Sequence, residues 1–247
     1  MLSQKIVTAV ATLFFPFIFS CAAQAASFDC AKARSKQEKL ICSTPALSQA
    51  DDLMAAKYKE AYAAAAKISS QEAAQLKTYQ SSWIMTGIEH CTPDVKCLSA
   101  SYKERISFLD FYLRQSQTPI AMAGTYERND LGNTGELQVR MKEANKIVFD
   151  VSAIYLMNRG TPYLTANEGE LAGESILTGN VAKYQKQIET DASCKLQITF
   201  SATKAVVEQD GFCGFGLNVS AGGVYFKTSN AVPEIKIDPT DPNHAIN

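Results

Sequence analysis

The spacing of apolar residues divides the chain into two regions. From residue 26 to residue 115, apolar side chains recur every three or four positions, which is the spacing of amphipathic helices. From residue 120 to residue 229, apolar and polar residues alternate between short turn sequences, which is typical of β-strands. The sequence Ser-Gln-Thr-Pro at 116–119 separates the two regions as a linker. We therefore predict an α+β protein of two domains, a helical bundle followed by an antiparallel β-barrel.

The first region carries the signals of four helices. Helices of these lengths are only marginally stable alone, so their apolar faces are expected to pack together. The last helix is expected to end near Leu113 and the first near Ile41. The predicted starts, in chain order, lie after Asp29, after Pro45, at the capping box Ser69-x-x-Glu72, and after Thr92-Pro93-Asp94.

The second region divides into about eight strands separated by turn sequences. The similar sequences Gly124-x-Tyr126 and Gly223-x-Tyr225 are expected to form the first and last strands, which meet if the barrel closes. This region resembles the lipocalin-like barrels of exported bacterial proteins. The expected strands are 124–127, 136–140, 146–151, 170–177, 181–188, 195–200, 205–208 and 223–227.

The two ends of the chain do not belong to either domain. Residues 1–25 have the pattern of a signal peptide, with Lys5, an apolar run and the cleavage sequence Ala23-Gln24-Ala25. The mature protein is therefore predicted to be periplasmic or secreted. The alternative is a lipoprotein anchored at Cys21, since residues 18–21 have the outline of a lipidation box. Residues 230–247 contain three prolines and few apolar residues, and we expect a disordered tail.

Cysteines support the assignment to an oxidising compartment. Removal of residues 1–25 leaves six of the seven cysteines, an even number that is typical of an exported disulfide protein. Cys194 and Cys213 flank a predicted hairpin and are expected to pair.

The four remaining cysteines flank the predicted helices. A straight helix would hold Cys30 and Cys42 about 18 Å apart, beyond the roughly 7 Å that a disulfide spans. We therefore expect Cys42–Cys91 with Cys30–Cys97. The alternative is Cys30–Cys91 with Cys42–Cys97.

Charge and motif content narrow the function. Without Lys5 the chain has 23 basic and 25 acidic residues, which gives no indication of nucleic-acid binding. The helical region has 12 basic and 10 acidic residues, whereas residues 116–247 have 11 and 15. The only histidines are His90 and His244, and neither has neighbours at the spacing of a metal site or a catalytic triad. We predict no catalytic residue, no metal and no cofactor.

The helical region contains a set of ordered motifs. Phe28-Asp29-Cys30, Glu38-Lys39-x-Ile41-Cys42, Gln80-x-x-Trp83, the pair Cys91 and Cys97, and Tyr102-x-x-Arg105 together resemble the LprI-like lysozyme-inhibitor family over residues 27–112. The sequence departs from that family at Ile84-Met85-Thr86-Gly87, where the family often has a charged stretch. The resemblance implies an exported, disulfide-bonded helical module, with lysozyme inhibition as the activity of the family's namesake.

Two groups in the second region are candidates for binding a partner. Glu168, Glu170 and Glu174 cluster near a predicted loop and could attract a basic lysozyme. The segment from Ser220 through Tyr225 to Lys227 resembles the Ser-Gly-x-x-Tyr motif of membrane-bound C-type lysozyme inhibitors, with one extra residue after the serine. The sequence thus predicts an exported binding protein that inhibits lysozyme or a related cell-wall hydrolase. The alternative is an envelope or small-ligand binding module without inhibitory activity.

Overall fold

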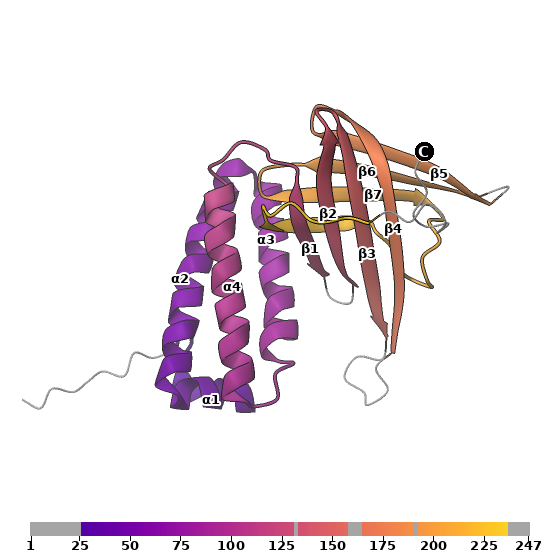
Figure 1. Cartoon of the computed structure of the whole chain (residues 1–247). Helices are drawn as coiled ribbons and strands as arrows, with labels where there is room; N and C mark the ends of the chain where they lie inside the picture. Colours follow the sequence, from indigo (N-terminus) through magenta and orange to yellow (C-terminus); the bar gives the residue numbers. More distant parts are fainter. Residues whose placement is uncertain (1–25, 131–132, 158–164, 190–191, 237–247) are drawn as a thin grey trace, which may run out of the picture.

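The computed structural model describes residues 26–130, 133–157, 165–189 and 192–236. Within these ranges the helices precede all of the strands, and they lie on one side of the sheet (Figure 1). None of the helices in the described part of the chain is long and apolar enough to cross a membrane. The helical elements are η1 (Cys30–Lys32), α1 (Lys36–Ser43), α2 (Pro45–Ile68), α3 (Ser70–Trp83), the π-helical turn η2 (Ile84–Ile88) and α4 (Val95–Gln115).

Side-chain caps fix where α3 and α4 begin, and a proline marks the start of α2. The Ser69 hydroxyl accepts a hydrogen bond from the Glu72 backbone N–H at 3.0 Å before α3. The Asp94 carboxylate accepts from the backbone N–H of Cys97 at 2.9 Å before α4, and Pro45 occupies the first turn of α2. These three starts were predicted from the sequence, because capping chemistry is local.

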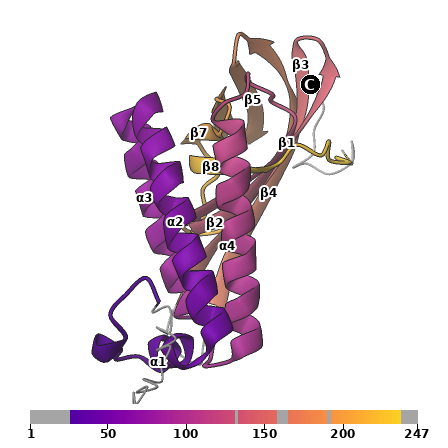
Figure 2. The same cartoon turned by 90° about the vertical axis from the view of Figure 1, so that its left-hand side faces the viewer.

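The three long helices pack through one apolar face each. Helix α2 contacts both α3 and α4, and Figure 2 shows the three helices side by side. Their buried residues repeat at intervals of about one or two helical turns, which keeps them on one face. They include Leu47, Met54 and Ala61 of α2, Leu76 of α3, and Leu98, Tyr102 and Leu109 of α4.

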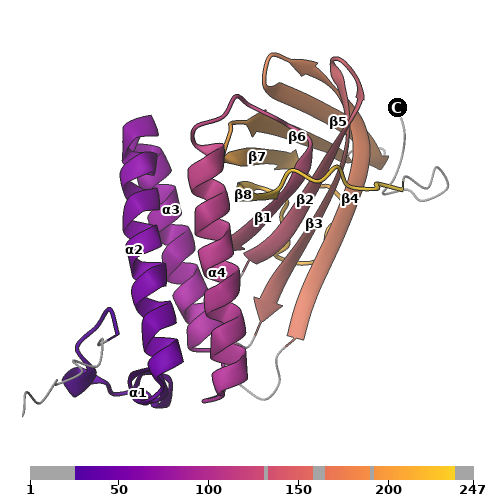
Figure 3. The same cartoon turned by 60° about the vertical axis from the view of Figure 1, so that its left-hand side comes forward.

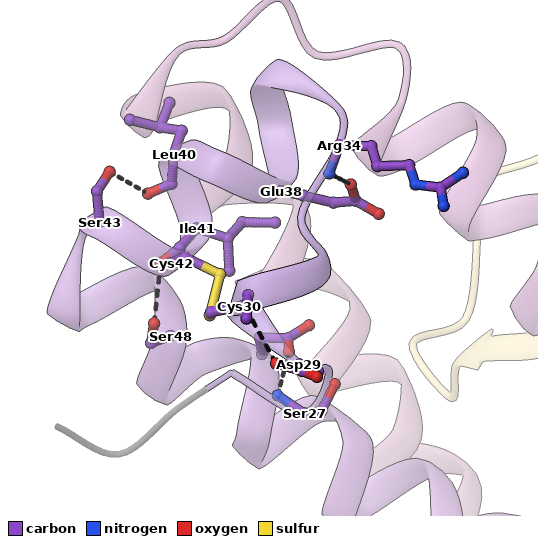
Figure 4. The surroundings of a disulfide bond; sticks show 12 residues. Ser27, Asp29, Cys30, Arg34, Glu38, Leu40, Ile41, Cys42, Ser43 and Ser48 are labelled. Carbon is purple, nitrogen blue, oxygen red and sulfur yellow. Dashed lines mark hydrogen bonds between the residues drawn. A yellow bond between two sulfur atoms is a disulfide. The ribbon is translucent and has the colours of Figure 1, made fainter. Parts of the chain in front are cut away.

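The first predicted helix is divided into two pieces, and this changes the disulfide pairing. Ser35 and Glu38 form a capping box that starts α1 after the short turn η1. The chain therefore bends before α1 and brings Cys30 to Cys42, with a Cα–Cα distance of 5.8 Å (Figure 4). The expectation of a straight helix that keeps these cysteines apart was wrong.

The second helical disulfide is also local. Cys91 pairs with Cys97 across the turn that Asp94 caps, again with Cα atoms 5.8 Å apart. Both pairings expected for the four helical cysteines, and their alternative, are therefore wrong. The disulfide between Cys194 and Cys213 was predicted correctly.

Eight antiparallel strands form the second half, as the turn spacing predicted. Each strand pairs with the next, and β1 also pairs with β8, so the strand order closes on itself. The strands are β1 (Gly124–Asp130), β2 (Asn133–Glu143), β3 (Lys146–Met157), β4 (Thr165–Thr178), β5 (Val181–Glu189), β6 (Ala192–Phe200), β7 (Lys204–Gly211) and β8 (Gly223–Ser229).

Strands β4 and β5 pair only at their hairpin end, through Leu177–Ala182 and Thr178–Val181. Further along β4, the segment between β7 and β8 takes the place of a strand. Its Gly216 N–H donates to the Glu168 carbonyl at 3.2 Å. Its Phe215 ring lies so close to Gly169 that a Cβ there would come within 2.4 Å of the ring. Glycine at 169 is thus required by this packing.

The interior of the closed sheet is occupied by one apolar cluster. Inward-facing side chains alternate with outward-facing ones along each strand, as a sheet with one buried face requires. Because side chains fill this core, the interior offers no support for a ligand site at the mouth of the sheet. The largest members of the cluster include Tyr126, Phe149, Phe200 and Tyr225.

The two halves share part of their packing. Phe226 of β8 is buried in the helical core and contacts the rings of Tyr79 and Tyr112 at centroid distances of 4.8 and 6.1 Å. Glu72 of α3 accepts a hydrogen bond from Thr203 at 2.7 Å and forms a buried ion pair with Lys204. These contacts join the halves through apolar and polar groups together.

The ends of the chain are described only in part. The expected signal peptide at residues 1–25, with Cys21, lies outside the described residues, as does 237–247. Within the start of the expected disordered tail, Ile235 is buried. The helices end at Gln115 and the strands begin at Gly124, on either side of the predicted linker.

Candidate functional site

A cleft of about 670 Å³ lies between the helices and the outer face of the sheet. Figure 3 shows α4 next to β1 and β2 along this junction. We call this feature the cleft and distinguish its helical wall from its sheet wall. The helical wall includes Tyr79, Trp83, Glu104, Arg105, Phe108 and Phe111, and the sheet wall includes Glu127, Asn129, Thr134, Glu136, Ser152 and Ile154.

Arg105 is the most unusual residue of the helical wall. Only 3% of its surface is exposed, and its guanidinium carbon lies 4.6 Å from the ring centre of Phe108 and 4.9 Å from that of Tyr79. Its Nε donates to the Gln80 side-chain oxygen at 2.8 Å. Its Nη2 has no hydrogen-bond acceptor among the described residues. The guanidinium is therefore fixed in position with donor capacity left over.

The environment of Arg105 compensates its charge only weakly. Burial lowers the pKa of Arg105 to about 10. Aromatic faces stabilise a buried cation by cation–π attraction, but they accept no strong hydrogen bond. A buried cation without an anionic partner is costly, so a site of this kind favours an incoming acceptor.

Residues of two sequence motifs meet at this wall. Gln80 and Trp83 lie one turn apart on α3, and Tyr102 and Arg105 lie one turn apart on α4. Arg105 donates to Gln80, and the rings of Trp83 and Tyr102 lie 5.8 Å apart, edge to face. The motifs thus define one packed unit that spans two helices.

The turn after Trp83 connects this unit to the sheet. It is a π-helical turn, in which Gly87 lies under the indole, and a Cβ at 87 would come within 2.7 Å of Trp83 Nε1. Thr86 of the same turn accepts a hydrogen bond from Asn129 of β1 at 2.9 Å. The departure from the family pattern at residues 84–87 therefore lies beside the cleft, where it supports Trp83 and contacts β1.

The sheet wall is acidic. Glu127 of β1 lies directly opposite Glu136 of β2, which lies opposite Ser152 of β3, which lies opposite Glu170 of β4. We call the glutamates Glu127, Glu136, Glu168 and Glu170 the acidic row. Residues opposite one another in a sheet share a face, so the row runs from the cleft across the outer face of β1–β4. Burial, with the nearby charges of Glu104 and Glu136, raises the pKa of Glu127 against the opposing hydrogen bond from Thr228.

The three glutamates predicted to bind a partner differ in their positions. Glu168 and Glu170 are exposed on β4 and belong to the acidic row. Glu174 is buried between Lys142 and Lys146, and hydrogen bonds from these two lysines lower the pKa of its carboxyl. Glu174 is therefore engaged within the sheet by two lysines, and its role in binding a partner stays a prediction.

The residues of the expected inhibitor motif do not form an exposed site. Tyr225 is fully buried in the sheet interior, and its hydroxyl donates to the Ala221 carbonyl at 2.8 Å. Lys227 is 1% exposed and donates to the Ala121 carbonyl. Ser220 is half-buried in a turn, where its hydroxyl accepts from the Gly222 N–H at 3.0 Å. Tyr225 and Lys227 are buried in the core, which gives no support to the prediction that they bind a partner.

Metal chemistry finds no support in the described part of the chain. No group of three or more histidine, cysteine, aspartate or glutamate side chains there is arranged to hold a metal ion. The acidic row is a line of carboxylates along a sheet surface rather than a converging set of ligands. What the cleft offers is a rigid cation, aromatic faces and carboxylate acceptors, which are the components of a binding site.

Comparison with known proteins finds one family match, which covers most of the helical half and part of the sheet. Residues 30–137 match the family model for lysozyme inhibitor LprI. The resemblance read from the sequence is thereby confirmed, and the match continues beyond residue 112 through β1 into β2. The LprI match therefore includes Arg105, Glu127 and Glu136, which lie on both walls of the cleft. No curated protein and no solved structure matches the chain.

Sequence reasoning recognised the motif residues but did not place them in a site. Trp83 and Arg105 appeared there only as members of family motifs. A signal was present, because Arg105 shares the apolar face of α4 with Tyr102, Leu109 and Tyr112. A cation within an apolar stripe is rare enough to suggest a special role.

Proposed function

We propose that this protein is an exported binding protein that inhibits lysozyme or a related cell-wall hydrolase. The observation that carries the proposal is the LprI match, since residues 30–137 contain the helical wall of the cleft and the β1 and β2 residues of its sheet wall. A matched region that contained only the helices would support a structural module. A matched region that extends to Glu136 supports a shared binding surface.

The acidic row gives the proposed partner a docking surface. Many lysozymes are basic, and opposite charges on two proteins raise the rate of association. Glu168 and Glu170 are exposed at the β4 end of the row, and Glu127 and Glu136 continue it into the cleft. The proposed partner is thus a basic enzyme that covers the outer face of β1–β4.

Export is supported by the cysteines and by the start of the chain. All six cysteines after residue 25 are paired in the structure, which suits an oxidising compartment. The signal sequence proposed for residues 1–25 would deliver the chain to the periplasm or beyond the cell. Acylation at Cys21 remains the alternative, in which the same domains are anchored to a membrane.

Lysozyme inhibition can be tested by the clearing of a bacterial wall suspension. The chain from residue 26 should inhibit a basic lysozyme at micromolar concentration, and inhibition should weaken as salt is raised. The charge reversals Glu168→Lys and Glu170→Lys should together weaken inhibition by about tenfold. The matched control is Glu208→Lys, an exposed glutamate on β7 outside the row.

Two outcomes would overturn the proposal. One is the absence of inhibition by a protein shown to be folded by circular dichroism. The other is clearing of the suspension by the chain alone, since Glu127 and Glu136 would then be acting as the acid and base of a hydrolase.

A second candidate function is a small-ligand binding module of the cell envelope. The specific observation in its favour is the cleft itself, whose volume of about 670 Å³ lies in the range of small-molecule sites. The cleft lies on the outer face of the sheet, whose interior is filled by side chains.

A further inference from the structure

The cleft combines a positively charged aromatic wall with an acidic, hydroxyl-bearing wall. Among its lining residues, Arg105, Arg114 and Arg128 are balanced by Glu104, Glu127 and Glu136. The site therefore repels neither an anion nor a cation as a whole. We propose that the cleft binds a saccharide that carries a carboxylate group, with Arg105 as the donor to that carboxylate. This inference does not require the protein to inhibit an enzyme.

Arg105 meets the requirements of a carboxylate receptor. Its guanidinium is held by the bond to Gln80 and by the rings of Tyr79 and Phe108, so little entropy is lost when a ligand binds. Its Nη2 has no acceptor within the described structure. An arginine fork pairs with both oxygens of a carboxylate, which gives a strong and directional contact. A neutral acceptor would leave the buried charge uncompensated.

The aromatic groups beside Arg105 suit the apolar face of a sugar ring. Trp83 and Phe111 line the same wall, and both are only half-buried. The C–H groups of a pyranose present an apolar face that stacks on aromatic rings. Next to them, Ser107 of α4 supplies an exposed hydroxyl that also lines the cleft.

The opposite wall suits the hydroxyl groups of a sugar. Carboxylates accept hydrogen bonds from hydroxyl and amide donors, and Glu127 and Glu136 present such acceptors side by side. Thr134 and Ser152 add hydroxyls that both donate and accept. A ligand with many donors on one side and a carboxylate on the other therefore matches both walls. An acidic peptide has the carboxylate but few donors for the paired glutamates.

Trp83 provides a direct reporter, because it is the only tryptophan of the chain and lines the cleft. We suggest a fluorescence titration with N-acetylmuramic acid and with N-acetylglucosamine, which share a ring and differ in the carboxylate-bearing substituent. The acidic sugar should bind at least about tenfold more tightly. Arg105→Lys should abolish this preference, since a point charge lacks the fork. Arg34→Lys, at an exposed arginine outside the cleft, should preserve it.

A second pair of variants tests the cleft independently, in case Arg105→Lys does not fold. Ser107 is exposed in the cleft, so Ser107→Phe should block binding of the acidic sugar without disturbing the core. Ser99→Phe adds the same ring at an exposed position of α4 that does not line the cleft. This variant should bind the acidic sugar as tightly as the unchanged protein does.

Three results would overturn the inference. They are equal affinity for the two sugars, no binding of either at millimolar concentration, and tighter binding of an acidic dipeptide such as Glu-Ala than of the acidic sugar. Failure of enzyme inhibition would leave this titration unaffected, so the two proposals can be rejected separately. Sugar binding with no inhibition would favour the envelope-binding function.

Discussion

The helical half and the sheet half of this protein differ in how far each completes its own core. The large apolar cluster of the sheet draws its buried members from the strands and from the segment between β7 and β8. The helical cluster also contains Phe226, with Val224 packed against it, and both belong to β8. The dependence thus runs mainly in one direction. The sheet supplies a side chain that the helices need, whereas the helices supply none of the buried residues in the sheet core.

This asymmetry affects the cleft, because the cleft lies where the two halves meet. The helical wall is positioned by α3 and α4, whose packing includes Phe226. A loss of that contact should loosen Arg105 and Trp83 before it disturbs the strands. Experiments that separate the stabilities of the two halves therefore also test how the site is held.

The largest effect is expected from Phe226→Ala. This ring is 1% exposed and contacts Tyr79, Phe108 and Tyr112, so its removal leaves a large cavity. We expect a loss of about 3–5 kcal/mol in the free energy of unfolding, concentrated in the helices. Hydrogen exchange should show α3 and α4 less protected while the strands keep their protection.

Phe200→Ala is the matched control, because Phe200 is equally buried but belongs to the sheet core. It should reduce the protection of the strands and of the helices together, since the helices rely on an intact β8. Equal loss of protection in both halves for Phe226→Ala would show that the halves unfold as one unit and contradict the asymmetry.

The next largest effect is expected from Lys204→Met. Lys204 forms a buried ion pair with Glu72 of α3 and donates to Gln75 at 2.5 Å. Removing one partner leaves a buried carboxylate without its cation, which costs about 3 kcal/mol. Chemical denaturation should show this loss. Lys195→Met removes an exposed ion pair with Asp210 and should change stability by less than about 1 kcal/mol.

The elements of the fold were largely predictable, since their signals are local. The capping residues Ser69 and Asp94 marked helix starts, and the turn signals at residues 143–145 and 179–180 marked the turns after β2 and β4. The first helix was misjudged because the Ser35–Glu38 capping box lies within a sequence of good helix formers and was not recognised as a new start. That one missed cap led to the wrong disulfide pairing.

The cleft could not be predicted, because it depends on the approach of two halves. Arg105 and Glu127 lie on separate domains in the sequence, and contacts between the halves, among them those of Phe226 and Lys204, bring their elements together. The burial of the predicted site residues Tyr225 and Lys227 could not be predicted for a related reason. Alternation in β8 showed that they share a face, but the sequence did not show that this face is the interior.

Removing one disulfide from each half should lower the free energy of unfolding by smaller amounts, which differ between the two halves. The cost of losing a crosslink increases with the length of the loop it closes. Replacing Cys194 and Cys213, 19 residues apart, by alanine should cost about 3 kcal/mol, and replacing Cys91 and Cys97, six residues apart, about 2 kcal/mol. Thermal denaturation of the two double variants checks this order. The reverse order would mean that the reduced helical half keeps less structure than loop length implies.

The smallest effect is a pH dependence that arises in the sheet half alone. Burial lowers the pKa of Lys227 to about 8, below its ordinary value of 10.5. Between these values the unfolded chain holds a proton that the folded chain has released, so stability should rise with pH across this window. From about pH 8 to about pH 9 the gain is at most about 1.4 kcal/mol.

Lys227→Met should remove this part of the pH dependence while all other titrating groups remain. The quantity to compare is the difference in the free energy of unfolding between the unchanged protein and Lys227→Met, measured by urea denaturation at each pH. Arg105, the buried cation of the helical half, stays mostly protonated between pH 8 and pH 9 because its pKa is about 10. The free energy of unfolding of the two proteins could instead change with pH by the same slope. The Lys227 amine would then be charged in the folded state, stabilised by the carbonyl of Ala121 and the ring of Tyr126.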